Sequence, residues 1–128
     1  MTIRPAYDMW PQYNRRLRDV IGAMTEQQLA IRSSPDRWPI WAIVGHTAGA
    51  RTYWLCDVAG EPGIEATPFE PGALEGWEDD LDHPRSAVEL VEALDSTFAI
   101  IEGCLDRWTP GMLDEEIRRE YGERVQVH

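Results

Sequence analysis

The chain has 128 residues, twelve arginines but no lysine, and a formal net charge of −11 at pH 7. A phosphate backbone would repel so acidic a protein, so nucleic acid is not an expected partner. The missing lysine also excludes Schiff-base chemistry and the phosphate-binding lysine of a P-loop, because both need an amine.

The length and the cysteine usage favour a small intracellular protein. Residues 1–128 are enough for a single domain with a core of its own. Cys56 and Cys104 form no C-x-x-C motif, and we expect both to be buried thiols. The first ten residues contain no apolar run typical of a signal peptide, so we expect the cytoplasm. His46 and Arg51 interrupt the most apolar stretch, which argues against a membrane span.

The N-terminal part predicts one amphipathic helix and a short helical turn. Apolar residues recur every three or four positions over residues 6–24. Pro11 lies inside this pattern and either kinks the helix or marks its first turn. Thr25 and Gln28 have the spacing of a capping box, which predicts a turn of helix before a loop at residues 30–37.

Residues 38–58 predict the central helix of the protein, with Pro39 at its first position. On a helical wheel an apolar arc faces the core and consists of Ile40, Ile43, Val44, Thr47, Trp54, Leu55 and Val58. The opposite side holds the small residues Ala42, Gly45, Gly49 and Cys56. Small residues let another segment approach closely, so we expect this helix to be covered on more than one side.

His46 and Arg51 are the two polar residues of this helix that need an explanation. His46 lies at the edge of the apolar arc, where we expect its imidazole to face the bundle interior. It is either a core histidine bonded to a main-chain carbonyl or part of a functional site. Arg51 projects within the arc, so we expect it to pair with an acid from a neighbouring helix.

Residues 59–83 hold many prolines, glycines and acids and predict one long loop. Such a loop is either a lid or binding loop or a solvated crossover, and Phe69 and Trp77 should anchor it. A cluster of acids could attract a cation or could simply be solvated. It consists of Glu78, Asp79, Asp80 and Asp82, next to His83.

Residues 84–108 carry a heptad pattern and predict a long helix packed at a shallow angle. The seam consists of Ala87, Val91, Leu94, Phe98, Ile101, Leu105 and Trp108. Beyond it, alternating residues around Gly122–Glu123 predict a short hairpin or extended arm. The sequence thus predicts three long helices. A fourth is missing, so we expect either a C-terminally incomplete bundle or a homo-oligomer that covers the gap.

The order of these segments resembles the DinB-like bacterial family over essentially the whole chain. The resemblance lies in the aromatic-rich first helix, the TEQQLA segment, the WPIWAIVGH segment that ends at His46, and the TPGMLDEEI segment. It implies a four-helix bundle, often dimeric, with a divalent metal such as Zn, Ni or Fe bound by three histidines. One of these is on the second helix, at the position of His46, and two are on the fourth, commonly as H-x-x-x-H. The chain has no H-x-x-x-H, and His83 and His128 match neither ligand position.

Two classes of function remain open. The resemblance implies a metal-dependent enzyme that transfers small thiols or acts as a hydrolase, with His46 as one metal ligand. The alternative is a non-catalytic bundle that self-associates as a homodimer or holds a small apolar ligand. In that reading tryptophans would line the ligand pocket, although they are more often core residues. These are Trp38, Trp41, Trp54 and Trp108.

Overall fold

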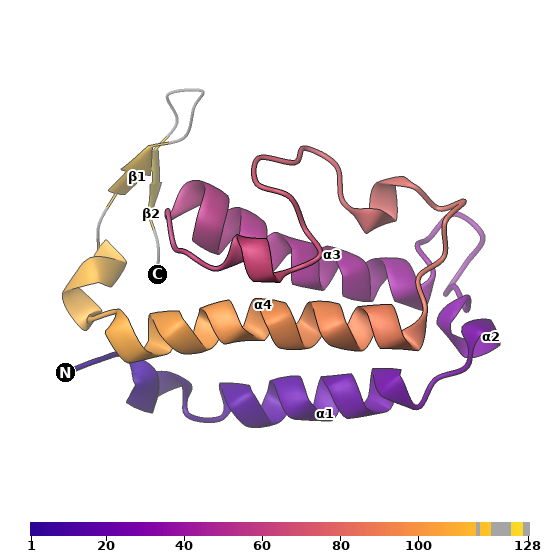
Figure 1. Cartoon of the computed structure of the whole chain (residues 1–128), viewed down its shortest axis with the longest axis horizontal. Helices are drawn as coiled ribbons and strands as arrows, with labels where there is room; N and C mark the ends of the chain where they lie inside the picture. The colour runs from indigo at the N-terminus through magenta and orange to yellow at the C-terminus, as the bar shows by residue number, and fades with distance from the viewer. Residues whose placement is uncertain (115, 119–123, 127–128) are drawn as a thin grey trace.

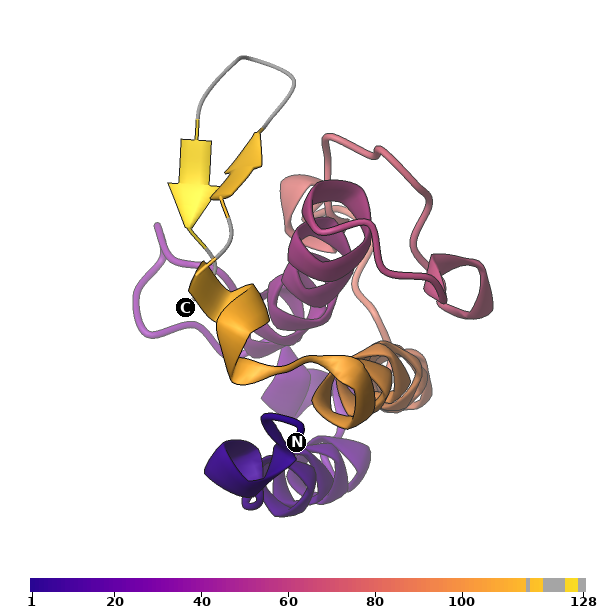
Figure 2. The same ribbon diagram turned by 90° about the vertical axis from the view of Figure 1, so that its left-hand side faces the viewer.

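The computed structural model describes residues 1–114, 116–118 and 124–126. Three long helices dominate it: α1 (Trp10–Gly22), α3 (Ile40–Thr52) and α4 (Ala87–Arg107). α4 lies between α1 and α3 and packs against both, as Figure 1 and, from one end, Figure 2 show. The predicted all-α bundle with three long helices is therefore confirmed. α4, and not α3, is its central helix.

The remaining elements are short. They are the helix α2 (Glu26–Leu29), a π-helical extension of α3 (Tyr53–Val58), 3-10 turns at Arg4–Tyr7, Ile64–Ala66, Trp77–Asp79 and Pro110–Asp114, and the strands β1 (Glu116–Arg118) and β2 (Arg124–Gln126). The strands pair antiparallel with Ile117 opposite Val125, which agrees with the predicted hairpin. Its expected turn at Gly122–Glu123 lies outside the described residues, as does His128.

Helix ends follow the expected local chemistry. Pro11 lies in the first turn of α1, so it marks the helix start rather than a kink. Thr25 and Gln28 form both hydrogen bonds of the predicted capping box. Ser86 caps α4 in the same way together with Glu89.

α4 is buried on two sides because it is packed between two helices. The predicted heptad positions Leu94, Phe98, Ile101 and Leu105 are all buried. A second row is also buried, and it consists of Leu90, Ala93, Thr97, Ile100 and Cys104. Both rows together make α4 the centre of the core.

The predicted orientation of α3 is only partly right. Val44 of the expected core arc is buried, and the side with the small residues is covered, as expected. Ile43 is 50% exposed, and Trp54, in the π-helical extension, is 43% exposed, although both were expected to face the core. The buried side instead includes Ala42, Gly45 and Ala48. The physical reason is close approach, because small side chains allow the neighbouring segments to come nearer than large ones do.

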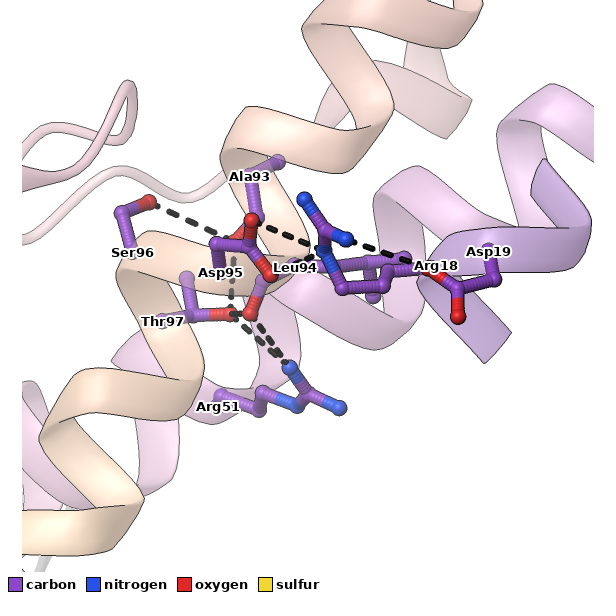
Figure 3. A network of polar contacts seen from close by, with 8 residues as sticks. All are labelled: Arg18, Asp19, Arg51, Ala93, Leu94, Asp95, Ser96 and Thr97. Atoms are coloured by element: carbon purple, nitrogen blue, oxygen red, sulfur yellow. Dashed lines mark hydrogen bonds and ion pairs between the residues drawn. The ribbon is translucent and has the colours of Figure 1, made fainter. Parts of the chain in front are cut away.

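The expected acid partner of Arg51 is not found among the residues that the structure describes. Its Nη1 donates to the main-chain oxygen of Leu94 at 3.0 Å and to Oγ1 of Thr97 at 3.1 Å. Asp95, the neighbouring acid on α4, accepts instead from Arg18 of α1, with 2.8 Å between Nε and Oδ1 (Figure 3). Neutral oxygens of α4 thus satisfy Arg51. Burial lowers the pKa of its guanidinium.

The start of the chain is fixed to the end of α4. The amide of Ile3 donates to the main-chain oxygen of Trp108 at 2.9 Å. Arg4 forms ion pairs with Glu102 and Asp106, each with an N to O distance of 2.7 Å. Among the described helices, none is long and apolar enough to cross a membrane.

Candidate functional site

His46 lies in the middle of α3, on the side that faces the long loop. Its side chain is 51% exposed, so the expectation that it faces the bundle interior is wrong. The reason is the orientation of α3, which turns its small residues inward and brings His46 to the boundary between the helix and the loop. The ring of Trp38 lies against the imidazole, with 5.1 Å between the ring centroids.

Glu78 is the partner of His46, and it comes from the 3-10 turn Trp77–Asp79. Nδ1 of His46 lies 2.9 Å from Oε1 of Glu78, whose side chain is only 11% exposed. An ionised carboxylate can only accept a hydrogen bond, so an ionised Glu78 requires the proton on Nδ1 of His46. The neutral imidazole then presents a lone pair on Nε2, which can accept a proton or bind a cation.

The turn that carries Glu78 is held in place by its own residues. The amide of Gly76 donates to Oδ2 of Asp79 at 2.8 Å, which closes the turn. A Cβ atom at position 76 would lie 2.6 Å from Oε1 of Glu78 and closer still to Oε2. Only glycine therefore lets the carboxylate of Glu78 fold back to this position.

Two aromatic side chains anchor the loop on α3, as predicted. Trp77 packs on Gly45 and Phe69 packs on Gly49, where an added Cβ would lie 3.2 Å and 3.4 Å from the respective side chain. The two rings contact each other, with 5.0 Å between centroids. The guanidinium of Arg85 covers Trp77 at 4.2 Å from the ring centroid. The loop is thus a packed part of the structure.

A cleft of about 220 Å³ lies between α3 and this loop. Residues that line it include His46, Tyr53, Asp57, Phe69, Glu75 and Glu78. Tyr53 and Asp57 belong to the π-helical segment, a local irregularity that is frequent at functional sites. The lining contains four acids and no arginine. We call this space the His46 cleft.

The described residues do not fit the three-histidine metal centre that the resemblance implies. Glu78 is bound to Nδ1 of His46, and Nδ1 of His83 lies 2.5 Å from Oδ2 of Asp80 on the exposed loop. In the part of the chain that the structure describes, no three His, Cys, Asp or Glu side chains are placed to hold a metal ion. His46 is one candidate ligand without described companions.

The tryptophans do not form one ligand pocket. Trp41 is 2% exposed and belongs to the core, but Trp38 and Trp54 are 39% and 43% exposed, so the expectation that these tryptophans are mostly core residues is not met. Trp54 lines the His46 cleft, whereas Trp38 lines a separate groove.

The role of Glu78 was missed from the sequence. It stood out only as a member of an acidic cluster, and nothing in the pattern linked it to His46, 32 positions away in the chain. The available signal was the pairing of Gly45 with the aromatic Trp77, which brings the neighbouring Glu78 to α3.

The comparisons with known proteins give one match. A profile of the DinB superfamily matches residues 12–127. No curated protein and no solved structure matches the chain significantly.

Proposed function

Because the chain belongs to the DinB superfamily, we propose that the His46 cleft is its functional site and that His46 is a proton acceptor there. The observation that supports this proposal is the hydrogen bond between Nδ1 of His46 and Glu78. A histidine whose Nδ1 is held by a carboxylate has its orientation and tautomer fixed, which suits the neutral ring for general base catalysis.

The reaction class that this arrangement supports is hydrolysis of a small molecule. In this reaction Nε2 of His46 accepts the proton of a water molecule that attacks the substrate, and Glu78 stabilises the resulting imidazolium. The volume of about 220 Å³ suits a small substrate. The acids that line the cleft, among them Asp57 and Glu75, favour a neutral or positively charged one.

The first test does not need a substrate. Nitrogen-15 NMR of the His46 side chain should show a proton on Nδ1 in the wild type. Glu78→Gln keeps an oxygen acceptor and should preserve this tautomer, whereas Glu78→Ala should abolish the preference. A wild-type ring with its proton on Nε2 would contradict the proposed role.

The second test measures turnover. Hydrolysis of a panel of small chromogenic esters and amides should fall at least a hundredfold in His46→Gln, in line with the usual contribution of a general base. His83→Gln is the matched control, because His83 lies on the exposed loop, paired with Asp80, and does not line the cleft. Equal losses in both variants would argue against a specific role of His46.

The ligand role of His46 toward Zn, Ni or Fe stays a prediction. A carboxylate on Nδ1 is also the arrangement that orients metal-binding histidines. Elemental analysis of wild type and His46→Ala tests it, since equal metal content in both proteins would contradict it.

A second candidate function is self-association as a homodimer. Ile43 and Trp54, on α3 and its extension, are 50% and 43% exposed, and a second copy of the chain packed on this helix would remove both from water. Light scattering should give a dimer mass for the wild type and a lower mass for Ile43→Glu. Val88→Glu is the control, because Val88 is 77% exposed on α4, outside this surface. A monomeric wild type would contradict the proposal.

A further inference from the structure

A second concave surface lies along the loop that enters α3. This groove has a volume of about 660 Å³. The residues that form it include Ile31, Arg32, Asp36, Arg37, Trp38 and Ile43. We call it the 31–43 groove.

The backbone of the groove is held in place by hydrogen bonds. The amide of Ile40 donates to the main-chain oxygen of Ile31 at 3.0 Å, which closes the loop at its base. The amide of Arg37 donates to the main-chain oxygen of Ser34, also at 3.0 Å. Nη1 of Arg32 reaches across to the main-chain oxygen of Arg37 at 3.1 Å. Arg32 and the backbone of Arg37 are therefore connected across a closed loop.

Three large apolar side chains of the groove are exposed to solvent. Ile31 is 56% exposed, Ile43 is 50% exposed and Trp38 is 39% exposed. Trp38 is fixed on one side by its contact with the ring of His46. An apolar molecule in the groove would remove parts of these three side chains from water.

The groove carries two arginines and one acid, so its charge is positive, in contrast to the acidic balance of the whole chain. Among the described residues, Arg4, Arg18, Arg85 and Arg107 form ion pairs with carboxylates, whereas Arg32 and Arg37 do not. The acid of the groove, Asp36, accepts a hydrogen bond from the hydroxyl of Ser34 at 2.5 Å. This bond lowers the pKa of Asp36, which therefore stays ionised.

We propose that the 31–43 groove binds a small amphipathic carboxylate, a molecule with one carboxylate on an apolar body. Arg32 and Arg37 hold the carboxylate, since guanidinium groups match its geometry with paired hydrogen bonds. Ile31, Trp38 and Ile43 hold the apolar body. This site is separate from the His46 cleft and does not depend on the function proposed for it.

The test is an NMR titration of the protein with octanoate, compared with octanol and octylamine of the same chain length. Octanoate should shift the amides of residues 31–38 and the indole N–H of Trp38, with an affinity at least tenfold above that of octylamine. Octanol should bind between the two, because it keeps the apolar contacts without the charge. The affinity for octanoate should also fall as salt is raised.

Variants of the exposed loop separate charge from packing without threatening the fold. Arg37→Gln should weaken octanoate binding by about fivefold or more and leave octanol binding unchanged. Arg32→Gln should weaken octanoate binding as well, but it also removes the bond to the main-chain oxygen of Arg37, so its effect on octanol binding should be larger than that of Arg37→Gln. Asp36→Asn should strengthen octanoate binding, because it removes a negative charge from the groove. Arg15→Gln is the matched control, since Arg15 is an exposed arginine on α1 outside the groove and without an ion pair among the described residues.

Three results would overturn the proposal. The first is no octanoate binding up to millimolar concentration. The second is equal affinity for octanoate and octylamine. The third is an equal effect of Arg15→Gln and Arg37→Gln, which would show that only the net charge of the protein matters.

Discussion

Nη1 of Arg51 on α3 lies 3.1 Å from Oγ1 of Thr97 on α4, in the interior between the two helices. Thr97 is fully buried, and its hydroxyl donates to the main-chain oxygen of Ala93 at 2.7 Å. The hydroxyl therefore accepts from Arg51 while it donates to its own helix. A charged side chain is in this way accommodated between two helices without a carboxylate.

We expect Thr97→Val to lower the free energy of unfolding by about 1–3 kcal/mol, because the partly buried guanidinium loses one of its two acceptors. Arg51→Met should lower the free energy of unfolding by less than Thr97→Val does. It removes the group that needs the acceptors and leaves Thr97 bonded to Ala93. Urea denaturation of the two single variants and the double variant checks this. A larger cost for Arg51→Met than for Thr97→Val would show that the guanidinium is net stabilising.

Gly45 and Gly49 should respond differently to alanine. Both lie inside α3, where alanine normally gains about 0.5–1 kcal/mol over glycine. At Gly49 the new methyl would be in ordinary contact with the ring of Phe69 at 3.4 Å, so stability should rise by this amount. At Gly45 the new methyl would lie 3.2 Å from Cβ and the ring of Trp77, which is tighter than ordinary contact. Trp77 should therefore be displaced, and Gly45→Ala should not raise the stability. Thermal unfolding followed by tryptophan fluorescence distinguishes the two variants.

The cap of α4 should make the free energy of unfolding depend on pH in the acidic range. Hydrogen bonding by the main-chain amide of Ser86 is the main cause that lowers the pKa of Glu89 in the folded protein. Glu89 therefore stabilises the folded protein fully at pH values above its pKa in the unfolded chain, about 4.3. This stabilisation is lost as the pH falls from there through the lower pKa of the folded protein. Glu89→Gln should flatten this part of the curve of stability against pH. An unchanged curve would contradict the assignment.

Ser86→Ala tests the other half of the same cap. It should lower the free energy of unfolding by about 1 kcal/mol at neutral pH, because the main-chain amide of Glu89 loses its acceptor. Thr25→Ala, at the start of the four-residue helix α2, removes an equivalent capping bond from a much shorter helix. It serves as a comparison, and both costs can be measured by urea denaturation.

The two cysteines should differ in reactivity. Burial raises the pKa of Cys104 to about 11. Only about one part in a thousand of this thiol is then ionised at pH 8, and the thiolate is the reactive form. Cys56 is half-buried, so iodoacetamide should modify it first in the folded protein, whereas both should react alike in urea. Mass spectrometry of digested samples measures the extent of modification of each cysteine, with Cys56→Ser as the control.

The parts of the fold that could be predicted from sequence depend on local patterns. The heptad of α4 placed Leu94, Phe98, Ile101 and Leu105 correctly in the core. The second buried row of the same helix was missed because it mixes small and polar residues such as Ala93 and Thr97. Hydrophobic periodicity detects one apolar face well, but it underestimates a helix that is buried on two sides.

The orientation of α3 and the partner of His46 could not be predicted for a related reason. The wheel assigned Ile43 and Trp54 to the core, where they do not lie. The small residues on the opposite side indicated a close neighbour but did not identify the segment. Which segment approaches is decided by Trp77 and Phe69, far away in the sequence. Glu78 reaches His46 only as a consequence of that long-range contact.

The position of α4 between α1 and α3 has a consequence for synthesis on the ribosome. α1 is the first long helix to emerge, but its main packing partner is complete only when Arg107 has been added. At the usual rates of translation the inward face of α1 stays uncovered for roughly ten seconds. Nascent chains of this protein should therefore engage chaperones through α1. Release should coincide with the exit of α4, when Ile3 and Arg4 also find their partners.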